Sequence, residues 1–205
     1  MVGCYPSNRH SVHPHGVFRR ATIAPEIRDL LSEPTPLPSA DVCVVGAGPA
    51  GIAASLALRD AGRTVLLLES GGERRSRRAQ LLNAGETVGE PYGGLRYTRH
   101  RRLGGTPHIW DVELGNRRGA KYAPLSPRDL EAWPLSFDDL RPWYDRAQAV
   151  CGLGPFVYDA GPWVIGRRRP FDLTGTGLVN AVYQFGPARR FTGELLDELK
   201  GAYGV

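Results

Sequence analysis

The fold of this chain is decided by the stretch Asp41-Val42-Cys43-Val44-Val45-Gly46-Ala47-Gly48-Pro49-Ala50-Gly51. Its apolar run predicts a short strand, and its glycines predict a tight turn that opens a helix. A second apolar run, Val65-Leu66-Leu67-Leu68, predicts the next strand and leads into Glu69. Strand, glycine turn, helix, strand and acidic residue follow in the order of a βαβ unit that holds the ADP half of a dinucleotide.

Each residue of this turn has its own physical role. Gly46 permits the tight turn, Gly48 lets the backbone approach a pyrophosphate, and Gly51 lets the helix pack closely on the strand. Pro49 loses no hydrogen bond in the first helical turn, and Ala50 follows it. The free N–H groups of that turn and the positive end of the helix dipole favour an anion. We therefore expect these five residues to contact the cofactor.

Glu69 lies 69 − 46 = 23 residues after Gly46, close to the spacing of about 20 expected for the carboxylate that binds the adenosine ribose. A carboxylate at this place would repel a 2′-phosphate, which argues against NADP. The alternative is a structural βαβ unit whose glycines serve turns only. The spacing between the glycines and Glu69 agrees with that of a dinucleotide site and therefore favours the cofactor site. Ser70 is expected to be a further contact to the cofactor.

The same stretch also predicts packing. The apolar residues Val42, Val44 and Val45 predict a strand that is buried on both faces, with Cys43 as a small buried hydrophobe. Small residues then recur at helical spacing and predict a closely packed helix that ends at Gly62; they are Ala50, Ala54, Leu58 and Ala61.

The composition indicates an ordinary globular protein, with 41% hydrophobic and 23% charged residues among 205. The net charge of +5 comes from arginines in several segments, so a nucleic-acid partner is not expected. The basic run Arg74-Arg75-Ser76-Arg77-Arg78 is interpreted as a solvated face, with contact to cofactor phosphate as the alternative. No apolar run approaches the roughly 20 residues of a membrane span.

The cysteines argue against a metal site. Cys4, Cys43 and Cys151 are odd in number and far apart, without a CxxC pair, so neither a disulfide framework nor a zinc site is expected. The N-terminus lacks the apolar region of a signal peptide. A reducing, cytoplasmic setting is the default expectation.

A second glycine site follows in Arg102-Leu103-Gly104-Gly105-Thr106-Pro107-His108-Ile109-Trp110. Paired glycines followed by a threonine expose successive backbone N–H groups and a hydroxyl, which suits a phosphate or the edge of a flavin. On its own this segment would be a turn with a core tryptophan. After the dinucleotide motif, it is better interpreted as a second cofactor contact.

Three blocks together resemble the glucose–methanol–choline (GMC) flavoprotein oxidoreductases, closest to bacterial members that are similar to pyranose oxidases and sugar dehydrogenases. The first block is Gly46 to Glu69 with Ser70-Gly71-Gly72, and the second is Arg102 to Thr106 with Trp110. The third is the most distinctive: it reads Pro124-Leu125-Ser126-Pro127-Arg128-Asp129-Leu130-Glu131 and then Trp133-Pro134-Leu135-Ser136-Phe137-Asp138-Asp139-Leu140-Arg141-Pro142-Trp143-Tyr144-Asp145-Arg146-Ala147.

The resemblance implies an α/β fold with a Rossmann-like FAD-binding βαβ unit and an inserted, partial substrate domain. The expected parts are an extended N-terminal segment at 1–40 with a short helix around 25–31, an FAD-binding part at 41–115, a substrate or cap region at 116–190, and a returning helix at 191–205. FAD contacts are implied for Arg102, Gly104, Gly105, Thr106, His108 and Trp110 beside the residues of the first motif.

The implied reaction is oxidation of a CH–OH group of an alcohol or sugar by hydride transfer to flavin N5. Some relatives attach FAD through a histidine directly before the tryptophan of this segment. Ile109 holds that position here and the histidine is His108, so a noncovalent flavin is expected. The alternative for His108 is a hydrogen-bonded loop histidine.

Family members continue well beyond a position equivalent to Val205, so the chain is expected to be an N-terminal portion that lacks a later strand of the FAD domain and the proton acceptor. None of His10, His13, His15, His100 and His108 is expected to replace that base. Two other functions stay open. One is a truncated or split protein without activity alone, which a complementary C-terminal chain would complete. The other is an NAD-dependent dehydrogenase.

Overall fold

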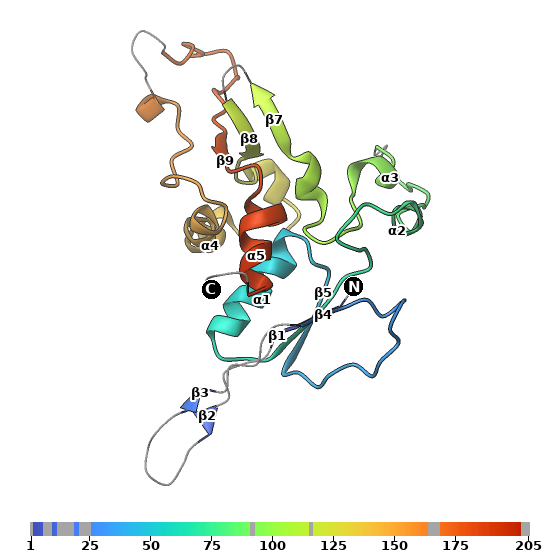
Figure 1. Ribbon diagram of the computed structural model, residues 1–205. Helices are drawn as coiled ribbons and strands as arrows, with labels where there is room; N and C mark the ends of the chain where they lie inside the picture. The colour runs from blue at the N-terminus through green and yellow to red at the C-terminus, as the bar shows by residue number, and fades with distance from the viewer. Residues whose placement is uncertain are drawn as a thin grey trace. The chain divides into compact units, whose positions relative to one another are not determined.

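The computed structural model describes residues 2–5, 10–11, 19–20, 26–90, 93–114, 117–163 and 169–201. It has a mixed α/β fold that divides into two compact units (Figure 1). The first unit comprises residues 1–109 and 189–205, and the second comprises residues 110–188. The expected glycine motifs at 46–51 and 104–106 both belong to the first unit.

A four-stranded sheet forms the centre of the first unit, in the order β4-β1-β6-β5. The parallel pair β5–β6 is joined through helix α1, whereas β1 pairs with β6 and with β4 in antiparallel fashion. This confirms the two predicted strands and the helix between them. The bounds are β1 (Val2–Tyr5), β4 (Glu26–Arg28), β5 (Val42–Val45), α1 (Pro49–Asp60) and β6 (Val65–Leu68).

Hydrogen bonds at both ends keep β5 and β6 in register. At the start, the Thr64 N–H donates to Asp41 Oδ2 at 2.8 Å, and the Asp41 N–H donates to Thr64 Oγ1 at 2.8 Å. At the end, the Gly46 N–H donates to the Leu68 carbonyl at 2.7 Å. The carboxyl ends of both strands are therefore level, which places the glycine turn beside Glu69.

The core of this unit lies between α1, β6 and helix α5 (Leu195–Leu199), which follows a π-helical turn at Arg190–Glu194. Figure 1 shows α1 and α5 side by side, and their residues are in contact. Arg59 of α1 donates to Glu198 Oε1 at 2.7 Å. The most deeply buried side chains are those of Ile52, Ser55, Val65, Leu67 and Leu199.

The packing face of α1 differs from the expected one. Ile52, Ser55 and Leu56 are buried, whereas Ala50 and Ala54 are exposed. Ile52 and Leu56 are four residues apart and share one helix face. The large apolar side chains, rather than the small ones, therefore form the contact surface, and the alanine spacing predicted the wrong face.

The prediction that the first strand is buried on both faces is also wrong. Cys43 is exposed, and the exposed fraction of Val45 is 81%. In the described sheet β5 is an edge strand, and α1 packs against one face only. The central strand β6 is the one whose residues are buried on both faces, with Val65, Leu66 and Leu67 all below 7% exposure.

The segment before Asp41 contains strands that the sequence did not predict. Residues 26–28, where a short helix was expected, form β4, which pairs with β1. A second small sheet joins β2 (His10–Ser11) to β3 (Arg19–Arg20). Propensity alone cannot find such strands, because pairing with another segment of the chain supplies the hydrogen bonds that define them.

The second unit contains an antiparallel sheet in the order β7-β8-β9 and the helix α4. Ser136 begins this helix: its hydroxyl accepts from the Asp139 N–H, and Asp139 Oδ2 accepts from the Ser136 N–H. This confirms the predicted N-cap as a capping box. The bounds are β7 (Asp111–Leu114), β8 (Arg117–Tyr122), α4 (Phe137–Val150) and β9 (Gln184–Gly186).

Short helical segments complete the described structure. They are α2 (Arg77–Leu81), α3 (Leu95–Thr98), and the 3-10 turns Thr106–Ile109, Pro127–Leu130 and Gly161–Trp163. Within the part of the chain that the structure describes, no helix has the length and apolar character needed to traverse a lipid bilayer.

Replacement of Leu199 by alanine tests the α1–α5 core. Leu199 is 1% exposed, so Leu199→Ala should lower the free energy of unfolding by about 2–5 kcal/mol through lost burial and a residual cavity. Leu37 is 48% exposed, and Leu37→Ala should change it by less than about 1 kcal/mol. Urea unfolding followed by circular dichroism measures both. Equal effects of the two variants would contradict this core.

Candidate functional site

The three glycines of the first motif are required for different reasons. Gly46 has φ 99°, a conformation that favours glycine. A Cβ atom on Gly51 would lie 1.8 Å from the Gly46 carbonyl oxygen, so α1 packs here directly on the turn. Gly48 has an ordinary φ of −83°, and a Cβ atom on it would meet no protein atom within 4 Å. The protein itself therefore leaves the space beside Gly48 open.

Helix α1 begins directly after Gly48. Pro49 occupies the first helical position as predicted, Ala50 follows it, and no side chain caps the N-terminus at Gly48. The first N–H groups of a helix have no intrahelical acceptor, and they carry the positive end of the helix dipole. This arrangement suits a phosphate group.

The carboxylate of Glu69 is held against the glycine turn. Its Oε2 accepts from the Ala47 N–H at 2.8 Å, and its Oε1 accepts from the Gly71 N–H at 2.9 Å. Ser70 donates its hydroxyl hydrogen to the same Oε1 at 3.3 Å. A carboxylate only accepts hydrogen bonds, so Glu69 is the chemical type of group that receives a hydrogen from a ligand hydroxyl.

The second glycine segment lies directly on the first. The Gly104 N–H donates to the Ala47 carbonyl at 2.9 Å, and a Cβ atom on Gly105 would lie 2.9 Å from Gly48 Cα. Both Gly104 and Gly105 have positive φ, at 86° and 66°. Two motifs that are more than fifty residues apart in sequence thus pack backbone on backbone, and they do so through the residues predicted from each motif.

The remaining predicted residues of this segment surround the glycines. The Thr106 hydroxyl accepts from the His100 N–H at 3.3 Å, and Arg102 donates through Nη2 to the Glu73 carbonyl at 2.6 Å. Among the described residues, His100 Nδ1 and Arg102 Nε are buried without a hydrogen-bond partner. Buried donors and acceptors of this kind are ordinarily satisfied by water or a ligand.

His108 is hydrogen-bonded within its own segment. Its Nε2 lies 2.9 Å from the Leu103 carbonyl, which accepts only, so the neutral ring carries its proton on Nε2. Burial lowers the pKa of His108 below the usual histidine value, and the charge of Arg102 acts in the same direction. Burial also lowers the pKa of His100, assisted by Arg75, His108 and Arg102. Both rings are therefore neutral at pH 7.

A cavity of about 750 Å³ opens where β5 and β6 end. Of the predicted residues, Gly46, Glu69 and Ser70 line it. Ligands of α/β proteins bind at the carboxyl ends of parallel strands, and the volume lies within the usual range of ligand sites. We call this cavity the dinucleotide crevice.

Several residues of the crevice were missed by the sequence analysis. Arg101 lines it and donates to Ser70 Oγ at 2.9 Å. A Cβ atom on Gly71 would lie 2.2 Å from the Arg101 carbonyl oxygen, so the two segments touch through their backbones. The double glycine after Glu69 was the available signal. Asp29, Leu30 and Leu31 also line the crevice, and nothing in their sequence indicates this.

Trp110 belongs to the second unit, where its ring lies 6.0 Å from that of Tyr122 in an edge-to-face arrangement. The structure thus places this predicted cofactor contact outside the unit that carries the glycine motifs. Of the histidines considered as bases, His13 and His15 lie outside the described residues.

Comparison with known protein families gives one match, to an FAD binding domain over residues 41–84. That segment contains β5, the glycine turn, α1, β6 and Glu69. The cofactor is FAD. An FAD-binding domain indicates a flavin-dependent oxidoreductase. Searches of curated proteins and of solved structures gave no match.

The described residues fit FAD. The open space beside Gly48 and the uncapped start of α1 suit its pyrophosphate, and the carboxylate of Glu69 is the kind of acceptor that binds a ribose hydroxyl. The crevice at the strand ends provides the volume for the adenosine half.

Alanine replacements at two glycines should separate folding from FAD binding. Gly48→Ala meets open space, so it should change the unfolding free energy of the FAD-free protein by less than about 1 kcal/mol while it weakens FAD binding. Gly51→Ala overpacks the turn, which typically costs about 1–3 kcal/mol, and it should lower both stability and FAD affinity. Flavin fluorescence titration and urea unfolding measure the two quantities.

Gly85→Ala is the matched control, because a Cβ atom there also meets open space and Gly85 does not line the crevice. It should leave FAD affinity unchanged. If Gly48→Ala bound FAD as tightly as the parent protein, the open space beside Gly48 would not be the phosphate site.

The two histidines predict a pH dependence of stability. Because their pKa values are lowered in the folded state, the neutral rings favour folding above the unfolded-state pKa of about 6.5, and this contribution is lost as the pH falls below it. The urea concentration at the midpoint of unfolding should therefore drop as the pH falls below about 6.5. His100→Gln combined with His108→Gln should flatten that drop. An unchanged slope in the double variant would contradict the assignment.

Proposed function

We propose that this protein is a GMC-type FAD-dependent oxidoreductase that oxidises a CH–OH group of an alcohol or a sugar, in a cytoplasmic setting. The supporting observation is the backbone contact between the Gly104–Gly105 segment and the turn at Ala47 and Gly48. A plain dinucleotide βαβ unit does not need a second glycine pair on its phosphate turn. A flavin protein uses such a pair to line the cofactor beyond the ADP half.

The proposal gives the first-unit residues three tasks. The start of α1, with Pro49, Ala50 and Gly51, binds the pyrophosphate, and Glu69 with Ser70 binds the adenosine ribose. Gly104, Gly105 and Thr106 extend the contact toward the flavin, and Arg102 supplies positive charge close to that segment.

The flavin is proposed to be noncovalent. His108 Nε2 is engaged with the Leu103 carbonyl at 2.9 Å, and that bond orients the ring within its own segment. A covalent link at Nε2 would remove the proton that this hydrogen bond needs. His108 therefore serves better as a positioning residue for the Gly104 turn than as an attachment point.

Bound FAD supplies the acceptor for a hydride from the CH–OH carbon. The protein must then accept the hydroxyl proton, a contribution typically worth about 10²–10⁴-fold in rate. Neither His100 nor His108 is assigned this task, because His108 is hydrogen-bonded to a carbonyl and His100 Nδ1 is buried. Both histidines instead provide neutral side chains that are held in place beside the proposed cofactor site.

The proposal predicts that the purified chain carries a flavin that is released into the supernatant by acid precipitation. Under anaerobic conditions, alcohols or aldoses should bleach the flavin absorbance, and re-oxidation should restore it. Glu69→Ala should lower FAD content and bleaching together, because it removes the contact to the ribose.

Three results would each refute one part of this proposal. Flavin that stays with the precipitate would refute noncovalent binding. A flavin that is reduced by dithionite but by no alcohol or sugar would refute the proposed activity of this chain while the assignment of FAD stands. A protein that binds NADH but no flavin would refute the cofactor assignment itself.

A further inference from the structure

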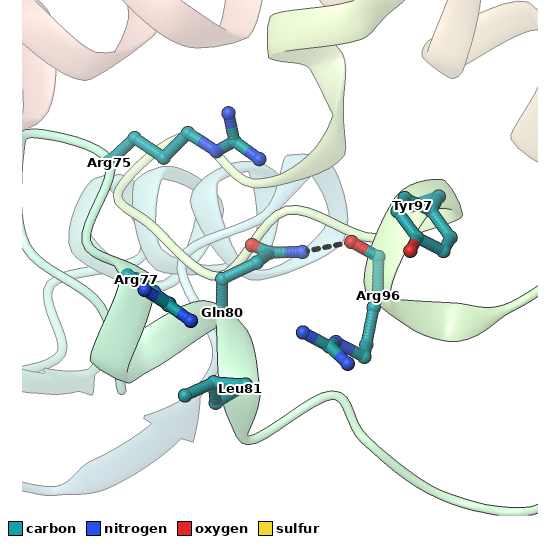
Figure 2. A pocket seen from close by; sticks show the side chains of 6 residues that line it. All are labelled: Arg75, Arg77, Gln80, Leu81, Arg96 and Tyr97. Atoms are coloured by element: carbon teal, nitrogen blue, oxygen red, sulfur yellow. Dashed lines mark hydrogen bonds between the residues drawn. The ribbon is translucent and has the colours of Figure 1, made fainter.

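A second cavity of about 420 Å³ lies beside α2, outside the dinucleotide crevice, and Figure 2 shows its six lining side chains. Three of them are arginines, and the others supply one buried amide, one aliphatic group and one aromatic ring. They are Arg75, Arg77, Gln80, Leu81, Arg96 and Tyr97. We call this cavity the arginine pocket.

The arginines of the pocket come from separate segments that Gln80 holds together. The Gln80 side chain is buried, and its Nε2 donates to the Arg96 carbonyl at 2.7 Å and to the Arg99 carbonyl at 2.5 Å. Its Oε1 accepts from the Arg101 N–H at 3.3 Å. In Figure 2 the side chains of Arg77 and Arg96 both extend toward the space beside Gln80. The position of Arg96 relative to α2 is therefore built into the fold.

The charges of these arginines have no counter-charge among the residues that the structure describes. In the described ranges of the chain, the guanidinium groups of Arg75, Arg77 and Arg96 form no hydrogen bond or ion pair. Other arginines of the first unit are engaged: Arg59 pairs with Glu198, and Arg101 donates to Asn83 and Ser70. Three free cations around one hollow repel one another, and an anion that enters it relieves that repulsion.

The arginine pocket is separate from the FAD site. The dinucleotide crevice is lined on this side by Ser76, Arg78, Ala79 and Leu82, whereas Arg77, Gln80 and Leu81 line the arginine pocket. The two sets alternate along α2 and its flanking residues, and no lining residue is shared. The positive charge of the pocket is therefore not explained by the FAD pyrophosphate, which is suited to the open space beside Gly48 at the start of α1.

We propose that the arginine pocket binds the phosphate group of a small molecule. Planar guanidinium forks match phosphate oxygens in pairs, and three of them suit a dianion with several oxygens better than a single carboxylate. Leu81 and Tyr97, which are 43% and 80% exposed, offer an apolar wall for an organic group carried by that phosphate. The volume suits a small ligand rather than a polymer.

The test is calorimetric titration of the full chain, saturated with FAD, with sodium phosphate and with phenyl phosphate at an ionic strength held constant with chloride. Both probes should bind. Arg96→Gln and Arg77→Gln should each weaken binding about tenfold or more, the usual value of a hydrogen bond to a charged group. If phenyl phosphate binds more tightly than inorganic phosphate, the ligand is an organic phosphate. If the two affinities are equal, the ligand is the free phosphate ion.

Arg74→Gln is the matched control, because Arg74 lies in the same basic run but does not line the pocket. It should change phosphate affinity by less than about twofold. Flavin absorbance of every variant should equal that of the parent, which shows that the fold and the FAD site are intact. The proposal is wrong if phosphate has no effect beyond that of chloride, if Arg74→Gln and Arg96→Gln weaken binding equally, or if phosphate binds only after FAD is removed.

Discussion

Backbone packed directly on backbone, with no room for a Cβ atom, organises the FAD site. It occurs where Gly51 meets Gly46, where Gly105 meets Gly48, and where Gly71 meets Arg101. The last two contacts join segments that are separated along the chain, and all three would be lost with any larger residue. Glu69 adds the polar counterpart, because its two oxygens hold the N–H groups of Ala47 and Gly71. The crevice depends on this set of close approaches more than on any single side chain.

The sequence predicted the parts of the site that follow from local backbone requirements. The strand at 42–45, the helix start at Pro49, the helix end at Gly62 and the cap at Ser136 are all short-range features, since a few neighbouring residues decide them. The proximity of Glu69 to the glycine turn could also be predicted from the sequence, because two parallel strands joined by one helix have their carboxyl ends at the same level.

Features that depend on non-local partners were not predictable in the same way. Cys43 and Val45 are as apolar as the residues of β6, yet they are exposed because β5 lies at an edge of the described sheet. The strand β4 exists only through its pairing with β1. The alanines of α1 marked a plausible contact face, and the position of α5 selected a different one. Periodicity reports which residues can be buried, whereas tertiary neighbours decide which of them are.

The helix α2 has only five residues, and it forms part of the wall of two cavities at once. If a ligand in one cavity shifts the position of α2, the shared helix links the two sites thermodynamically. Linkage is reciprocal: the factor by which one ligand changes the affinity for the other is the same in both directions. Gln80, which ties this helix to the segment at 96–101, is then the residue through which occupancy on one side is felt on the other.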